Sequence, residues 1–119
     1  MIDRIVVISP CRNEEMFIGK ALESMIRQTR RPDRWIIVDD ASTDTSAEIV
    51  AEYCKKHPWI ELVRRKREGG RKHGPGVVSA FNYGYALIGD DDFDFIVKMD
   101  CDIEFEPDCI EKTLRHFED

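Results

Sequence analysis

The 119-residue sequence lacks any apolar run long enough to cross a membrane. Its apolar runs, such as Ile5 to Ile8, fall far short of the roughly 20 residues that a transmembrane helix needs. An export signal is also missing, because no basic start leads into an apolar core and a small-residue cleavage site. These absences predict a cytoplasmic protein, with membrane association only through segments outside this sequence.

Two further absences narrow the class of protein. The sequence has no cysteine pairs at the short spacings of zinc sites, which indicates reduced, structural thiols at its four cysteines, Cys11, Cys54, Cys101 and Cys109. It also has no excess of positive charge. Its 24 acidic residues outnumber 18 lysines and arginines, and the net charge of -6 argues against a general nucleic-acid-binding surface.

One stretch runs against this acidic balance. Residues 64–72 contain six cations around Glu68, Gly69 and Gly70: Arg64, Arg65, Lys66, Arg67, Arg71 and Lys72. Two interpretations stay open. The stretch is either a solvated loop or a mobile loop whose charge suits a phosphate-bearing ligand.

Hydrophobic patterns predict alternating strands and helices. Short β-branched or apolar runs predict buried strands at 5–8 and 35–38, a weaker edge strand at 60–63 and a fourth strand within 93–99. Helical stripes cover 17–26, 49–54, 77–86 and 110–117. A Thr45-x-x-Glu48 capping box is expected to start the second helix, a Gly74-Pro75-Gly76 entry the third, and Pro107 to lie in the first turn of the last.

This order predicts a single α/β domain over residues 1–119. Alternation without a hairpin signal indicates a Rossmann-like three-layer sandwich with a mostly parallel sheet. In such sheets ligands bind beyond the carboxyl ends of the strands. Polar residues follow three of the predicted strands, at Ser9 to Glu15, Asp39 to Asp44 and Asp100 to Asp102. Each group also has a simpler interpretation, as helix caps or turn formers.

Charge favours a ligand at this edge. Asp39, Asp40, Asp100 and Asp102 are expected to crowd one rim, where two like charges ~4 Å apart repel by about 4 kcal/mol at an effective dielectric near 20. Raised carboxylate pKa values or a bound cation would relieve this repulsion. An Asp-x-Asp turn offers oxygen ligands to Mn²⁺ or Mg²⁺ and leaves positions open for a diphosphate.

The motifs together resemble family-2 glycosyltransferases of the GT-A fold. Four segments carry the resemblance, in the family's order and over nearly the whole chain: Val6 to Glu15, Ser24 to Thr29, Ile37 to Asp44 and Val97 to Asp102. The resemblance implies a sheet of strand order 3-2-1-4 and the N-terminal, nucleotide-sugar-binding half of a catalytic domain. The expected ligand is a UDP- or GDP-sugar, and the acceptor hydroxyl of a sugar, lipid phosphate or protein is not specified.

The resemblance also implies residue roles. Pro10, Arg12 and Glu14 would line the nucleotide pocket, Asp40 would contact the base, and Asp39 would support the loop. Asp100 and Asp102 would hold the metal and the donor diphosphate or ribose. The glycine-rich segment through Lys72 and the helix to Asn82 would lie near the phosphates.

The sequence departs from the family pattern at three points. The family often has an aromatic residue in place of Arg12 and an arginine near Phe81, and its general base and acceptor-binding strands are expected beyond Asp119. A non-catalytic nucleotide-binding or interaction domain therefore stays an alternative. The absence of glycine directly after the first strand argues against a nucleotidyltransferase. An uncovered sheet edge predicts a homodimer.

Overall fold

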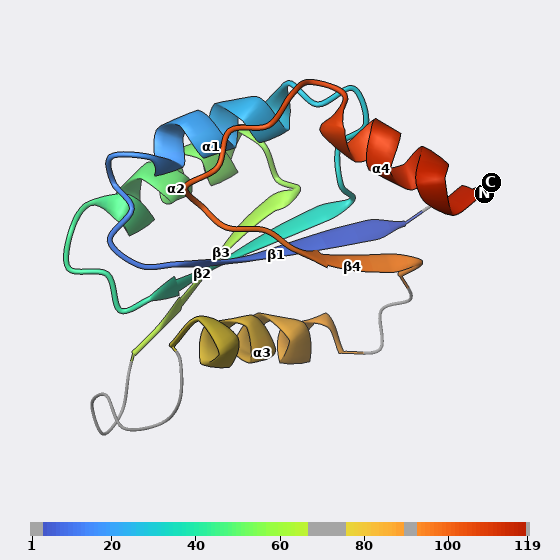
Figure 1. Ribbon diagram of the computed structural model, residues 1–119. Helices are drawn as coiled ribbons and strands as arrows, with labels where there is room; N and C mark the ends of the chain where they lie inside the picture. Colours follow the sequence, from blue (N-terminus) through green and yellow to red (C-terminus); the bar gives the residue numbers. More distant parts are fainter. Residues whose placement is uncertain (1–3, 67–75, 90–92, 119) are drawn as a thin grey trace.

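The computed structural model describes residues 4–66, 76–89 and 93–118. Strands and helices alternate from β1 to α4, as the hydrophobic pattern predicts (Figure 1). The elements are β1 (Ile5–Cys11), α1 (Ile18–Ile26), β2 (Arg34–Asp40), α2 (Ser46–Lys56), β3 (Ile60–Arg65), α3 (Gly76–Ile88), β4 (Phe95–Lys98) and α4 (Cys109–Glu118). None of the described helices combines the length and apolar character of a membrane span.

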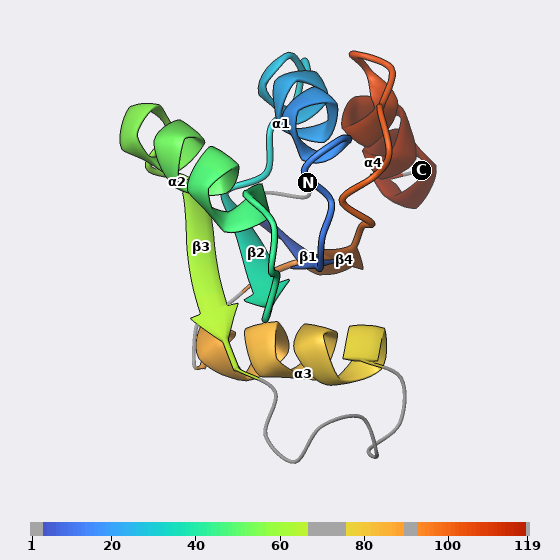
Figure 2. The ribbon, with the colours of Figure 1, turned by 90° about the vertical axis from the view of Figure 1, so that its left-hand side faces the viewer.

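The four strands form one parallel sheet in the order β3-β2-β1-β4, which confirms the predicted order. The two central strands carry the continuous apolar runs, because both of their faces are covered. Helices α1, α2 and α4 cover one face and α3 covers the other (Figure 2). The result is the expected three-layer sandwich, with β3 at one edge as predicted and β4 at the other.

Alternating strand residues supply two cores. Val7 and Ile37 belong to the core under α1, α2 and α4, whereas Val6 and Ile36 belong to the core under α3. Helix α3 approaches the sheet closely at Gly84, where an added Cβ would lie 2.8 Å from Ile8 Cγ2. This glycine is therefore required by close packing.

The expected start of α2 is confirmed, since Thr45 is its N-cap, but two expected features of helix starts are wrong. Thr45 makes no side-chain cap hydrogen bond, so the capping box does not form. The Asp44 Oδ1 atom accepts instead from the Ser46 backbone N–H at 2.9 Å. Helix α4 begins at Cys109, so Pro107 lies before its first turn. The segment ahead of α4 is held by Gln28, whose Nε2 donates to the Glu106 carbonyl at 2.6 Å.

Candidate functional site

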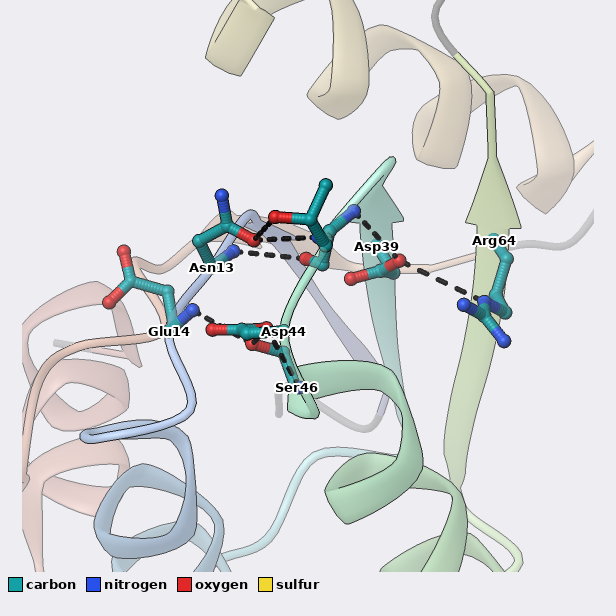
Figure 3. Close-up of polar contacts among 8 residues, drawn as sticks. Asn13, Glu14, Asp39, Asp44, Ser46 and Arg64 are labelled. Carbon is teal, nitrogen blue, oxygen red and sulfur yellow. Dashed lines mark hydrogen bonds and ion pairs between the residues drawn. The ribbon is translucent and has the colours of Figure 1, made fainter.

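The loops that follow β1 and β2 interlock at the carboxyl edge of the sheet (Figure 3). The Asn13 backbone N–H donates to Ser42 Oγ at 3.0 Å, and the Thr43 backbone N–H donates to Asn13 Oδ1 at 2.8 Å. Asn13 adopts a positive φ of 52°. It does not cap α1, which begins five residues later, and it joins the two loops instead.

A second set of contacts lies deeper in the same edge. Buried Ser46 accepts from the Glu14 backbone N–H at 2.8 Å and donates to Asp44 Oδ1 at 2.5 Å. The Glu15 backbone N–H donates to Asp44 Oδ2 at 3.2 Å, and Glu15 Oε1 accepts from the Thr45 backbone N–H at 3.1 Å. The serine and aspartate after β2 therefore fix the backbone after β1.

Asp39 and Asp40 end β2 and point to opposite faces of the sheet, as successive strand residues do. Asp39 Oδ2 lies 3.9 Å from Arg64 Nε, and Asp40 Oδ1 lies 2.9 Å from Arg65 Nε. Parallel pairing of β2 and β3 sets both partners, because Asp39 is in register with Arg64 and Asp40 with Arg65. Both aspartates are buried.

These ion pairs correct two expectations. Four uncompensated aspartates were expected at one rim. Two of them, Asp39 and Asp40, are instead paired with arginines of the protein. Arg64 and Arg65 also belong to β3 rather than to a loop. Lys72, with Arg67 and Arg71, lies outside the described residues. Sequence reasoning missed the pairing, although an Arg-Arg pair ending the strand next to Asp-Asp was a signal for it.

Asp39 carries an unmet hydrogen-bonding need. Its Oδ1 atom is buried and finds no hydrogen-bond partner among the described residues. Its other oxygen accepts only a long contact from the Ser42 backbone N–H, at 3.4 Å, beside the Arg64 ion pair. A buried carboxylate oxygen without a donor is costly, so this atom suits a donor from a ligand.

The turn after β4 has two exposed acidic side chains. Asp100 and Asp102 are exposed, while Cys101 between them is buried. Lys98 Nζ lies 3.2 Å from Asp100 Oδ1. The pKa of Glu14 is raised by partial burial and then by the nearby charges of Asp102, Asp44 and Asp100. The structure therefore brings Glu14 of the β1 loop within electrostatic reach of the Asp-x-Asp turn.

The donor set suits a cation that a ligand completes. No group of three or more His, Cys, Asp or Glu side chains within residues 4–66, 76–89 and 93–118 could hold a metal ion by itself. Mg²⁺ is commonly bound by only one or two carboxylates together with substrate phosphates. Asp100 and Asp102 fit that arrangement, because they offer two exposed carboxylates at one turn.

Of the remaining predicted residues, Pro10 and Arg12 lie at the carboxyl end of β1, whereas Asn82 lies within α3. Pro10 is half-buried within β1, in register with Val38 of β2. Arg12 directly follows β1 and is exposed. Asn82 is exposed on α3, on the opposite side of the sheet from α1 and α2. The loop residues after β1, β2 and β4 thus share one edge, with Asp40 turned toward α3.

Known proteins share the fold of this chain. The family model "Glycosyl transferase family 2" matches residues 6–119. A probable glycosyltransferase of Bacillus subtilis, YdaM, is 34% identical over 85 residues, which cover 70% of this chain and 20% of the relative. Among solved structures, residues 1–349 of S. aureus TarS in complex with UDP-GlcNAc give a TM-score of 0.73 at 21% identity, covering 98% of this chain and 31% of that one.

A second solved structure binds a different donor. The mannosyltransferase PcManGT from Pyrobaculum calidifontis, in complex with GDP-Man and Mn²⁺, gives a TM-score of 0.73 at 22% identity. The match covers 100% of this chain and 33% of that chain. The chain thus spans a third or less of the length of these relatives, and its fold is of the GT-A type. The chain belongs to glycosyl transferase family 2, whose model matches nearly all of it.

Proposed function

We propose that residues 1–119 form the donor-binding domain of a metal-dependent glycosyltransferase. The domain binds a UDP- or GDP-sugar together with Mn²⁺ or Mg²⁺, and the sugar passes to an acceptor hydroxyl. The carrying observation is the exposed pair Asp100 and Asp102, beside a Glu14 whose pKa their charges help to raise. TarS has been solved with UDP-GlcNAc and PcManGT with GDP-Man and Mn²⁺, which supports this class of donor.

Each residue has a distinct task in this proposal. Asp100 and Asp102 hold the cation, which would stabilise the leaving diphosphate when bound. Pro10, Arg12 and Glu14 line the nucleotide pocket. The Arg12 guanidinium is exposed next to the loop and offers a planar cationic face to the nucleotide.

The strand β2 supplies the base contact. Asp40 accepts a hydrogen bond from the base. Asp39 offers Oδ1, which has no partner among the described residues, to a donor of the nucleotide while supporting the loop. Lys72 is proposed to lie near the phosphates. The general base that activates the acceptor hydroxyl is a prediction about residues beyond Asp119, and the cytoplasmic location also stays a prediction.

A binding experiment tests the donor site. Isothermal titration of the chain with UDP and GDP, each with and without Mn²⁺, should show binding that strengthens with metal. Asp100→Asn and Asp102→Asn together should remove the metal dependence and weaken UDP binding by at least about tenfold, which corresponds to about 1.4 kcal/mol.

The matched control is Asp108→Asn. Asp108 lies before α4 and pairs with Lys112 at 3.2 Å, so its loss changes the net charge as much as either single substitution, Asp100→Asn or Asp102→Asn, without touching the turn after β4. Equal weakening by the control would mean that bulk charge and not the Asp-x-Asp turn governs binding. No binding of either nucleotide would favour the non-catalytic interaction domain instead.

The homodimer is proposed at the edge strand β4. Ile96 on this strand is 38% exposed, and β4 has a partner strand on one side only within the described sheet. Sedimentation velocity at increasing concentration should show a dimer, and Ile96→Lys should abolish it. A chain that stays monomeric at high concentration contradicts the proposal.

A further inference from the structure

Arg65 joins three elements at the edge where the nucleotide is proposed to bind. Its Nε lies 2.9 Å from Asp40 Oδ1 at the end of β2. Its Nη1 donates to the Ser79 carbonyl of α3 at 3.1 Å, and its guanidinium carbon lies 5.8 Å from the centre of the Tyr83 ring. Arg65 is therefore anchored on α3 as well as on the aspartate.

The ion pair decides what Asp40 can do chemically. An ionised carboxylate accepts hydrogen bonds and donates none, whereas a protonated one can donate. A neighbouring positive charge favours the ionised form, and burial without that charge favours the neutral one. The Asp40 side chain is only 3% exposed, so water compensates little of its charge, and the Arg65 guanidinium at 2.9 Å compensates it directly.

Nucleobases differ in what they offer to such an acceptor. Uracil and guanine carry a ring N–H on their pairing edge. Cytosine and adenine carry a bare ring nitrogen at the corresponding position, which can only accept. Cytosine and adenine also carry an amino group beside that nitrogen, so the distinction depends on where the carboxylate is held. A carboxylate fixed opposite the ring position suits uracil and guanine and meets a second acceptor in cytosine and adenine.

We infer that Arg65 is a positioning residue that sets the class of nucleobase. It holds Asp40 in one orientation and in its ionised form, so that the site selects bases with a ring N–H. This inference rests on the proposed function, in which Asp40 contacts the base. It adds a residue of β3, together with its anchors on α3, to the groups that determine donor specificity.

The contacts of Arg65 indicate that Asp40 binds the base and Arg65 at the same time, and that the base does not displace Arg65. A carboxylate has about four acceptor positions on its two oxygens, and the ion pair with Arg65 occupies only part of them. If the base displaced Arg65, the arginine side chain, which is 16% exposed, would lose the charge that compensates it. Its Ser79 and Tyr83 contacts hold it in place beside Asp40.

The test compares four nucleotides on the 119-residue chain. Isothermal titration with UDP, GDP, CDP and ADP in Mn²⁺ should show that the unmodified chain prefers UDP and GDP by about tenfold or more, the worth of one hydrogen bond to a charged group. In Arg65→Gln the affinity for UDP should fall by about fivefold and the UDP-to-CDP ratio should approach one. Arg65→Lys, which keeps the charge but not the planar fork, should restore part of the ratio.

Arg34→Gln is the matched control. Arg34 pairs with Glu61 between the same two strands, at 2.6 Å from Nε to Oε2, but at the opposite end of β2. Its loss should lower the melting temperature and leave the nucleotide ratio unchanged. A purely structural role for Arg65 would give this same result.

The outcomes separate the two proposals. If the unmodified chain binds none of the nucleotides, the proposed function fails. If it binds them and folded Arg65→Gln keeps the original ratio, the role of Arg65 is overturned while the proposed function stands. Tighter UDP binding by Arg65→Gln also overturns it, because it would mean that the base displaces the arginine. If Arg65→Gln does not fold, an unchanged ratio in Arg65→Lys overturns the inference equally.

Discussion

Asp39 and Asp40 are adjacent in sequence but lie in different chemical environments. Asp39 faces the layer of α1 and α2, keeps one oxygen without a partner among the described residues, and has only a distant arginine at 3.9 Å. Asp40 faces α3 and is held at 2.9 Å by Arg65, which is itself fixed on that helix. Two adjacent residues of the same type thus differ in how closely an arginine approaches them.

The same contrast distinguishes the two layers around the site. On the side of α1 and α2, side-chain hydrogen bonds such as those of Asn13 and Ser46 link two loops over about thirty residues of sequence. On the side of α3, close packing at Gly84 and the Arg65 contacts fix the helix to the sheet. Both layers rest on an apolar core. Polar contacts between loops add to it on the side of α1 and α2, and close approach at Gly84 with the Arg65 contacts adds to it on the side of α3.

The largest expected effect comes from removing each aspartate charge in turn. Asp40→Asn leaves Arg65 without its buried partner, and loss of one member of such a pair should cost about 3 kcal/mol of the free energy of unfolding. Asp39→Asn should change it by less than about 1 kcal/mol, because the partner Arg64 is 60% exposed and remains solvated. Urea denaturation measures both. Equal losses would show that the two environments do not differ as described.

Much of the fold was predictable from sequence. The continuous apolar runs of β1 and β2 predicted buried central strands, and the charged flanks of residues 60–63 predicted an edge strand. These inferences succeed because burial on two faces, on one face or at an edge leaves a local mark in the sequence. The strand order followed from the family resemblance and not from the hydrophobic pattern.

The polar part of the site was predictable only as a set of loops. Four acidic residues were assigned to one edge, but their partners depend on register. The Arg-Arg pair that ends β3 indicates candidate partners for Asp-Asp, and only the register of β2 with β3 places Arg65 opposite Asp40. The capping box failed for a related reason. The Thr45 hydroxyl bonds to Glu15 of the other loop and not to its own helix, while Asp44 accepts from the first N–H of α2, at Ser46.

The next largest effect on stability is expected from replacing one glycine in a helix on each side of the sheet. Gly84→Ala would place a Cβ within 2.9 Å of both Ile8 and Val38 side-chain carbons, and overpacking of this kind should cost about 2 kcal/mol. Gly19→Ala in α1 meets no atom within 4 Å and should stabilise the protein by about 0.5–1 kcal/mol through helix propensity. Thermal denaturation of both variants provides the measurement. A stable Gly84→Ala variant would show that α3 can move away from the sheet.

The smallest expected effect concerns the backbone between the two layers. Ala41 directly follows the aspartates and adopts a φ of 58°, a left-handed conformation that costs a residue with a Cβ about 1–2 kcal/mol. Ala41→Gly removes this strain but adds chain entropy to the unfolded state, so a net stabilisation of about 0.5 kcal/mol is expected. Ala47→Gly in α2 is the control and should destabilise the protein by about 1 kcal/mol, because there φ is helical and the side chain is buried. If both variants lose stability to the same extent in urea, the turn after β2 is not strained. In that case, strain at Ala41 does not contribute to the different environments of Asp39 and Asp40. The pairing register of β2 with β3 then accounts for those environments.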